Sequence, residues 1–315
     1  MAEPIPDTAH FIWFGDALPW VYELALRSCA ARSGLGTIVF HHDGRLEASR
    51  LADLETIVGL ETSRIEPGSL FERAYPGLAP RLHDRFRRLD KPNAWANMVR
   101  AAILSAEGGI YLDQDTLTLR SLRPLLDDGA FCGEEPVAWP EEVVRRRRIG
   151  PKAKALGLDA LRAACSLVPG GWLAFRPFEG LYARAANNAV LGARPRHPFF
   201  QRLLEAMVEL PEARMRRPFA LGTHLLQQEL KRGREGVVVH PAEVFFPLGP
   251  AISRHYFQLT RRAWVERVIT PQTRVVHWYA SVATKRLLPR IDAAFILEHA
   301  DRMPFCALAR PFVDA

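Results

Sequence analysis

The 315-residue chain has few cysteines and no long apolar run, and both shortages exclude classes of protein. Its four cysteines, Cys29, Cys132, Cys165 and Cys306, are widely spaced and include no Cys-x-x-Cys pair. Such spacing indicates neither a zinc site built on cysteines nor a disulfide framework. Because no stretch of about 18 apolar residues is present, a membrane-spanning helix is not predicted either.

The chain also lacks internal repeats, low-complexity tracts and a signal peptide. Its first residues, Met-Ala-Glu-Pro-Ile-Pro, contain neither the basic nor the apolar region of a secretory signal, so we expect a cytoplasmic protein. A chain of this length with 48% hydrophobic residues is able to bury a large core. We therefore predict a single domain over residues 1–315.

Positive charge is in excess, with 42 lysines and arginines against 35 acidic residues and a formal net charge of +7. Two arginine clusters stand out, at residues 81–88 and 145–148. A solvated face is the plain explanation for both. The functional alternatives are attraction to an anionic donor, to an acidic or lipid-phosphate acceptor, or to the inner membrane surface. No known nucleic-acid-binding motif is present, so nucleic acid is not a predicted partner.

The first half of the chain alternates between strand and helix patterns. Residues 10–14 and 37–40 are apolar and predict strands, whereas residues 19–31 and 46–58 have helical periodicity. This alternation predicts an α/β fold with a mostly parallel sheet flanked by helices, which binds ligands beyond the carboxyl ends of its strands. Residues 134–168 are interpreted as a helical insertion or lid, and Val168 to Phe175 as a turn leading into a strand.

The most informative segment runs from Glu107 to Thr116 and places Asp113 and Asp115 at the exit of a short apolar strand. Alternate side chains of a strand share one face, so both carboxylates are expected to point the same way. They offer hard oxygen ligands that suit Mg²⁺ or Mn²⁺. A turn or a solvated strand end explains most isolated Asp-x-Asp pairs equally well.

A helix is predicted immediately before this strand, from Pro92 onward. Its apolar residues recur at helical spacing and form one stripe, which comprises Trp95, Met98, Val99, Ala102, Ile103 and Ala106. Asn97 and Arg100, three residues apart, project together on another face. Gly108 and Gly109 then end the helix, because glycine tolerates the left-handed backbone of such a turn.

These elements resemble the sugar-binding region of glycosyltransferases that carry an Asp-x-Asp motif. The group includes fungal initiating mannosyltransferases, capsular-polysaccharide transferases and, more distantly, clostridial glucosylating toxins. The family pattern reads Ser-Asp-x-x-Arg on the helix and Gly-Gly-x-Tyr-x-Asp-x-Asp at the strand. Arg100, Asp113 and Asp115 match it, and the resemblance implies that these three are catalytic. Asn97 replaces the acid that contacts the ribose or donor sugar, which removes a charge but keeps hydrogen-bonding capacity.

The resemblance extends to both ends of the chain. The early segment around Phe11, Ile12 and Trp13 is similar to the strand that receives the nucleotide base, although a tryptophan there is more often a core residue. The late segment from His277 to Ser281 is similar to an element in which the histidine binds the metal and the serine approaches the phosphates. Val282 departs from the family's tryptophan. Lys285 is a further candidate for the diphosphate.

A third ligand distant in sequence is chemically reasonable, because two carboxylates leave much of an octahedral cation to water and diphosphate. An imidazole also moves the preference from Mg²⁺ towards Mn²⁺. The resemblance therefore implies a metal site of Asp113, Asp115 and His277. It also implies that Ile12, Trp13, Asn97, Arg100, Ser281 and Lys285, with Phe11, contact the nucleotide sugar.

We accordingly predict a GT-A-type glycosyltransferase that transfers a sugar, with retention, from a nucleotide-sugar donor to a glycan, lipid-linked or small-molecule hydroxyl. UDP is the favoured nucleotide by analogy. Front-face attack and double displacement agree equally well with the sequence. The alternatives are a catalytically degenerate nucleotide-sugar or glycan binder of the same fold, and a phosphatase that also uses Asp-x-Asp. The phosphatase pattern requires a threonine where this chain has Leu117.

Overall fold

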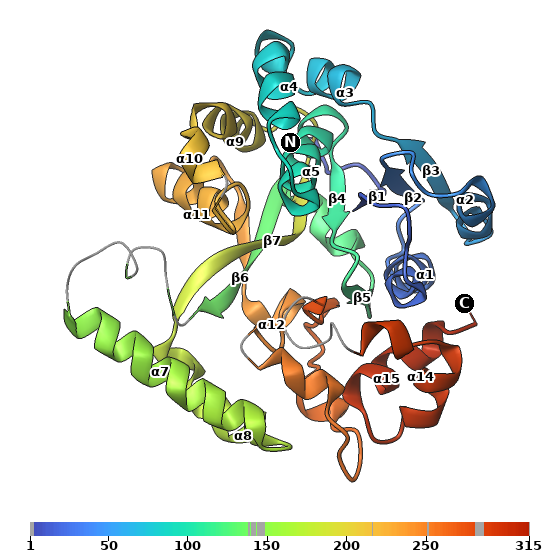
Figure 1. Ribbon diagram of the computed structural model, residues 1–315, viewed down its shortest axis with the longest axis vertical. Coiled ribbons are helices and arrows are strands. Elements are labelled where there is room, and N and C mark those ends of the chain that lie inside the picture. Colours follow the sequence, from blue (N-terminus) through green and yellow to red (C-terminus); the bar gives the residue numbers. More distant parts are fainter. Residues whose placement is uncertain are drawn as a thin grey trace.

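The computed structural model describes residues 3–137, 139, 143, 149–215, 217–250, 252–280 and 287–314. A seven-stranded sheet crosses the molecule in the order β3-β2-β1-β4-β7-β6-β8 (Figure 1). The strands are β1 Thr8–Trp13, β2 Thr37–His42, β3 Leu60–Arg64, β4 Gly109–Leu112, β6 Ala130–Val137, β7 Ala183–Ala193 and β8 Val238–His240. Only β7 runs against its neighbours in this sheet. The predicted mixed α/β class with a mostly parallel sheet is thereby confirmed.

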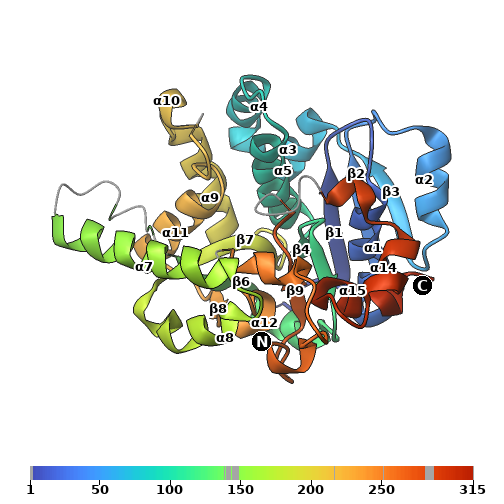
Figure 2. The ribbon, with the colours of Figure 1, turned by 60° about the horizontal axis from the view of Figure 1, so that its bottom comes forward.

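Helices cover both faces of the sheet, as Figure 2 shows for α3, α4 and α5 on one side and α1 on the other. One apolar cluster joins the sheet to helices α3 Pro67–Ala74, α4 Ala79–Arg87, α5 Pro92–Ala106, α9 Pro198–Glu209 and α11 Thr223–Arg232. A second cluster joins the other face to α1 Glu23–Arg32, α2 Ala48–Glu55 and α12 Ala242–Phe245. Within β1, Phe11 belongs to the second cluster and Ile12 to the first, as the alternation of side chains along a strand requires.

A two-stranded antiparallel sheet lies beside the large one and pairs β5 Thr116–Thr118 with β9 Val275–His277. Its register sets Thr116 opposite His277. A third apolar cluster packs this small sheet against α8 Gly171–Phe175, α14 Ala293–His299 and α15 Pro304–Ala309. The other α-helices of the described ranges are α7 Ile149–Leu167 and α10 Glu212–Met215. Strand β5, which directly follows Asp115, is therefore held in place by the last third of the chain.

The local predictions differ in their outcome. The strands predicted at 10–14 and 37–40 correspond to β1 and β2, and the helices predicted at 19–31 and 46–58 correspond to the shorter helices α1 and α2. The strand predicted at the end of Val168 to Phe175 is wrong, because the segment from Gly171 forms helix α8. Trp172 and Phe175, three residues apart, are both buried in that helix, whereas a strand would place them on opposite faces.

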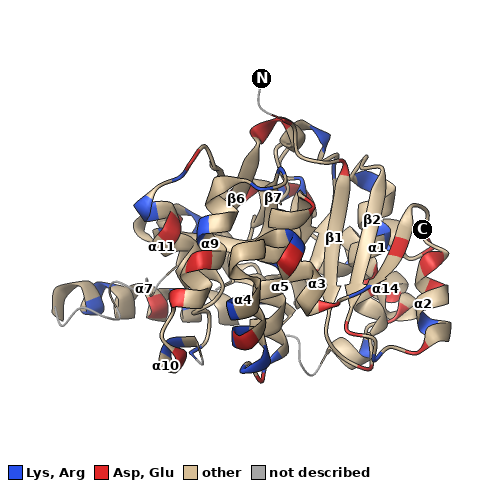
Figure 3. Cartoon of the chain, turned by 90° about the horizontal axis from the view of Figure 1, so that it is seen from above, with Lys and Arg blue, Asp and Glu red and all other residues tan. Residues whose placement is uncertain are grey.

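The predicted insertion or lid covers part of β6 and the 19-residue helix α7, and its role as a lid remains a prediction. The arginine run at 145–148 lies outside the described residues. Figure 3 shows Lys, Arg and acidic residues mixed over the outer helices α2, α4, α9 and α11. Among the helices that the structure describes, none has the length and apolar content needed to cross a bilayer.

Candidate active site

A cavity of about 1360 Å³ opens beyond the carboxyl ends of β1 and β4. Seven of the sequence-predicted site residues line it: Ile12, Trp13, Asn97, Arg100, Asp113, Asp115 and His277. They come from β1, α5, the turn after β4 and the end of β9. This is the edge of the sheet at which parallel strands bring ligand-binding loops together.

Two glycines let the chain turn sharply from α5 into β4. Gly108 and Gly109 have φ angles of +71° and +94°, which favour glycine. A Cβ atom on Gly108 would also lie 2.7 Å from Pro195 Cδ and 2.8 Å from Pro6 Cδ. Any other residue would therefore push the strand, and Asp113 with it, out of place.

Asp113 is held on three sides. Its Oδ1 atom accepts a hydrogen bond of 2.5 Å from the Tyr111 hydroxyl and lies 3.1 Å from Arg100 Nη1. Its backbone N–H donates to the Ala189 carbonyl at 2.8 Å. The Arg100 guanidinium is itself fixed, because it lies over the Tyr111 ring at 4.4 Å and donates to the Asn188 carbonyl at 2.5 Å. Oδ1 of Asp113 is thus occupied by protein donors.

Asp115 has a different set of partners, all from the end of β9. Its Oδ1 atom lies 2.9 Å from His277 Nε2, and its Oδ2 atom accepts from the Ala280 backbone N–H at 2.8 Å. The Asp115 carbonyl accepts from the Trp278 N–H at 3.0 Å. Asp113, Asp115 and His277 each offer a ligand atom, and these atoms all lie within 4.8 Å of one another.

The two carboxyl groups have opposite electrostatic environments. Burial raises the pKa of Asp113, and the nearby Arg100 guanidinium offsets only part of this effect. Burial acts in the same direction on Asp115, but the attraction and hydrogen bond of His277 outweigh it and lower the pKa of that carboxyl. Burial likewise opposes protonation of His277, and Asp115 overcomes it and raises the pKa of the imidazole. Asp115 is therefore the carboxylate that ionises more readily.

The predicted base-binding strand is placed in part as expected. Ile12 and Trp13 line the cavity, and the Trp13 indole donates to the Ala17 carbonyl at 3.1 Å and packs on Tyr22. The predicted contact of Phe11 with the nucleotide sugar has to be corrected, because Phe11 is fully buried in the core on the opposite face of the sheet. Side chains alternate along β1, so Phe11 packs on the opposite face of the sheet from Ile12, whereas Trp13 is the last residue of the strand and lies at its open end.

Asn97 and Arg100 both reach the cavity from α5, as their spacing predicts. The side-chain oxygen of Asn97, Oδ1, accepts a hydrogen bond of 2.7 Å from the side-chain amide of Asn188. A Cβ atom on Gly222 would lie 3.0 Å from that same oxygen, so the chain passes close above it. Ser281 and Lys285 lie outside the described residues. Their predicted contacts with the phosphates stay predictions.

The structure adds cavity residues that sequence reasoning missed. Glu135 of β6 accepts a 2.6 Å hydrogen bond from the hydroxyl of Tyr279, and both side chains are buried. The two are 144 positions apart, so no local pattern signals the pair. Gln114, between the two acids, is buried as well, and its amide has no hydrogen-bond partner among the residues that the structure describes. An amide of this kind is available to a ligand.

Residues 39–132 match the family model described as "Glycosyltransferase sugar-binding region containing DXD motif". This segment contains Asn97, Arg100, Asp113 and Asp115. The match confirms the resemblance and the enzyme class, a glycosyltransferase, that the sequence predicts. No curated protein matches the chain.

Several solved structures are similar in fold. The galactosyltransferase LgtC, in complex with donor and acceptor sugar analogs, has 16% identity and a TM-score of 0.46, with 98% of this chain and 97% of that one covered. Mouse xyloside xylosyltransferase 1 has 10% identity and a TM-score of 0.44, covering 86% and 96%. The UDP-bound glycosyltransferase domain of the YGT toxin has 9% identity and a TM-score of 0.43, covering 76% and 80%. At these scores they carry no argument about donor or acceptor.

Proposed function

We propose that the protein is a metal-dependent, retaining glycosyltransferase that uses a nucleotide-sugar donor, with UDP as the favoured nucleotide. The acceptor is a hydroxyl group of a glycan, a lipid-linked molecule or a small molecule, as in polysaccharide biosynthesis. The observation that carries the proposal is the convergence of ligand atoms from Asp113, Asp115 and His277 within 4.8 Å of one another at the cavity. Both aspartates lie in the matched sugar-binding region, and His277 joins them from outside it. We place the enzyme in the cytoplasm, where its net positive charge would allow peripheral contact with the inner membrane surface.

The spacing of these side chains fits a divalent ion. Two ligands in neighbouring positions of an octahedral ion, each about 2.1 Å from it, lie about 3.0 Å apart. The separation of Asp115 Oδ1 and His277 Nε2 is 2.9 Å. Asp113 contributes through Oδ2, because Oδ1 is engaged by Arg100 and Tyr111. Two carboxylates with one imidazole suit Mn²⁺ or Mg²⁺, and the imidazole favours Mn²⁺.

The chain's own residues orient the donor for transfer. Asp115, His277 and Asp113 would hold the cation, which when bound neutralises charge on the leaving diphosphate. Arg100 fixes Asp113 and, with Asn97, faces the sugar and ribose; Ile12 and Trp13 provide an apolar wall for the base. Ser281 and Lys285 complete the proposed phosphate contacts. Retention at the anomeric carbon rests on the family resemblance, and both front-face attack and double displacement agree with it.

The first test is release of UDP from a panel of UDP-sugars in the presence of Mn²⁺. Asp115→Asn keeps the size of the side chain but removes its charge, so we expect turnover to fall by more than about 100-fold. The matched control is Asp53→Asn on the exposed face of α2, which should leave turnover unchanged. Equal turnover in Asp115→Asn and the wild type would remove the metal assignment.

A degenerate binding protein is the second candidate, because Asn97 stands where the family has an acid. Thermal shift followed by an assay of UDP release separates the two. Both candidates predict that UDP stabilises the protein only when Mn²⁺ is present, since ligand that binds the folded state raises its stability. Only the enzyme then releases UDP from a sugar donor. Metal-dependent stabilisation without release for any donor or acceptor would favour the binder.

A further inference from the structure

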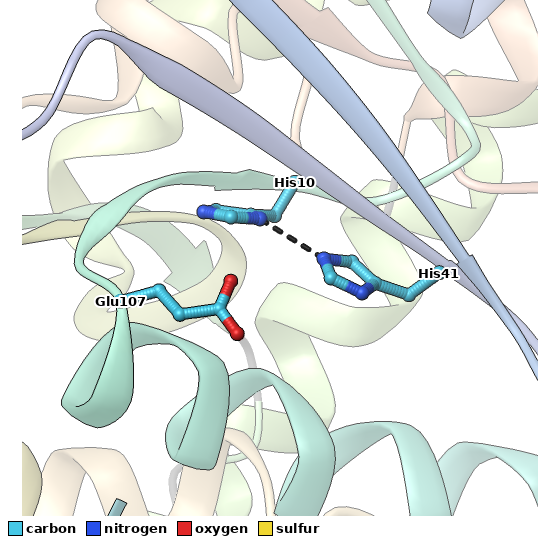
Figure 4. A group of neighbouring side chains, drawn as sticks. All are labelled: His10, His41 and Glu107. Atoms are coloured by element: carbon cyan, nitrogen blue, oxygen red, sulfur yellow. Dashed lines mark hydrogen bonds between the residues drawn. The ribbon is translucent and has the colours of Figure 1, made fainter. Parts of the chain in front are cut away.

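A second cluster of metal-ligating side chains lies apart from the cavity. His10 of β1, His41 of β2 and Glu107 at the end of α5 face one another (Figure 4). His10 Nδ1 and His41 Nε2 are 3.0 Å apart, and one ligand atom from each of the three residues lies within 4.8 Å of the others. None of the three lines the cavity.

The fold places the two imidazoles together. β1 and β2 are parallel neighbours whose register sets His10 opposite Val39 and Ile12 opposite His41, so the histidines are diagonal neighbours on one face. The backbone leaves room for the first ring at Gly109, where a Cβ atom would lie 2.7 Å from His10 Nε2. This glycine has a φ of +94°, which a residue with a side chain adopts only with strain.

Burial keeps the imidazoles uncharged. His10 is 2% exposed and His41 5%. In the shared N···N contact one ring nitrogen must be an unprotonated acceptor, which is the form that binds metals. Burial lowers the pKa of His10 to about 4, and the Glu107 charge only partly opposes this. A hydrogen bond with the Gly108 backbone also opposes it in part, and His10 Nε2 is buried.

Glu107 completes the set from the solvent side. Its side chain is 34% exposed, so an ion has a path into the cluster. One carboxylate oxygen, Oε1, lies 2.8 Å from Nη2 of Arg73 on α3. This contact orients the carboxylate and leaves Oε2 free to serve as a ligand, as the outer partners of metal-binding carboxylates commonly do. The arginine also contributes a positive charge that opposes a divalent ion.

We propose that His10, His41 and Glu107 form a second metal site, suited to Zn²⁺, that ties β1, β2 and the end of α5 together. Two imidazoles and one carboxylate, with water as fourth ligand, are a common zinc set. Imidazole nitrogens about 2.0–2.1 Å from a tetrahedral ion lie about 3.3 Å apart. The observed 3.0 Å requires the rings to separate by only a few tenths of an ångström. This site is independent of the proposed sugar transfer.

The test uses the full chain with Asp115→Asn, which disables the cavity site. After removal of metal with a chelator, we expect calorimetric titration to show one Zn²⁺ bound per chain. Co²⁺ should then give the intense visible absorption of a four-coordinate ion rather than the weak bands of a six-coordinate one. No bound Zn²⁺ in this protein would overturn the proposal, whatever the result for sugar transfer.

Two substitutions added to Asp115→Asn assign the ligands. Glu107→Gln, at the half-exposed position, should keep the fold and weaken Zn²⁺ binding at least about 10-fold. His41→Gln should abolish binding. His299→Gln is the control, because His299 bonds the Phe295 carbonyl within α14 and belongs to neither cluster. Unchanged Zn²⁺ affinity in both Glu107→Gln and His41→Gln would contradict the assignment.

Discussion

Individual side chains determine how differently the two acids of the motif behave. Asp113 contacts Tyr111 and Arg100, which belong to β4 and to the helix just before it. Asp115 contacts His277 and Ala280 from the far end of the chain. The first acid is therefore held by its own neighbourhood, whereas the second depends on a remote segment. Burial raises the pKa of both carboxyl groups; the partners of Asp113 offset only part of this effect, whereas those of Asp115 outweigh it, so the two pKa values shift in opposite directions.

His197 offers a test of a buried histidine outside both clusters. It caps the first turn of α9, where its Nδ1 atom accepts from the Phe199 N–H at 3.3 Å. Burial, with a smaller effect of the Arg194 charge, lowers its pKa to about 4. The unfolded chain, whose histidines have a pKa near 6.5, therefore binds the proton first, and stability is lost as pH falls from about 6.5 to 4.

His197→Asn keeps a capping oxygen but cannot take up this proton. We expect the wild type to lose roughly 1–2 kcal/mol more than the variant between pH 7 and pH 4.5. Urea unfolding of both proteins at the two pH values measures this difference, and other buried histidines cancel in the comparison. Parallel losses in the two proteins would show that His197 does not titrate on unfolding.

At the scale of elements, local pattern and local structure agree best where helix, glycine pair and strand follow one another. Residues 92–112 carry an apolar stripe, a double glycine and a short apolar run, and they form α5 and β4 as predicted. The prediction of a strand after Val168 was wrong because a short apolar run fits a strand and a buried helix equally well. Tertiary packing of Trp172 and Phe175 decided for the helix.

The loop before α11 contains a strained residue at the cavity. Phe219 has a φ of +63° and is 68% exposed, although it is neither glycine nor asparagine. A left-handed backbone costs such a residue about 1 kcal/mol. Because strain of this kind persists mainly at functional positions, its retention at the cavity fits a role in substrate binding.

Comparison of Phe219→Gly with Phe219→Ala isolates the strain, since both variants lack the ring. We expect the glycine variant to be the more stable by about 1 kcal/mol in urea unfolding. The same comparison at Ala52, an exposed position within α2, should give the reverse order, because glycine destabilises an ordinary helix by about 0.5–1 kcal/mol. The same order at both positions would mean that Phe219 is not strained.

At the scale of the whole molecule, the active site depends on contact between the two sheets. Tyr279, just after β9 of the small sheet, donates to Glu135 of β6 in the large sheet at 2.6 Å. The Tyr279 backbone has a φ of +55°, so the chain accepts strain to reach this position. The bond links the segment that carries His277 to the central sheet.

Tyr279→Phe removes this hydroxyl and leaves the buried Glu135 carboxyl with one donor fewer. We expect the free energy of unfolding to fall by about 1–3 kcal/mol. Tyr75 is a matched control, because its hydroxyl also donates to a glutamate, Glu205, at 2.6 Å, but at the surface. Tyr75→Phe should cost less than about 0.5 kcal/mol. Equal effects would show that burial does not strengthen the Tyr279 bond.

The sequence by itself determined the α/β class, the helix–glycine–strand unit and the acid pair, because these depend on interactions between residues close in the chain. It also indicated His277, through family resemblance rather than through spacing. Only the tertiary structure decided that Phe11 faces the core, that Glu135 and Tyr279 meet, and that His10, His41 and Glu107 converge. Such contacts join residues far apart in the chain, and their positions follow from sheet order and packing, which local pattern does not encode.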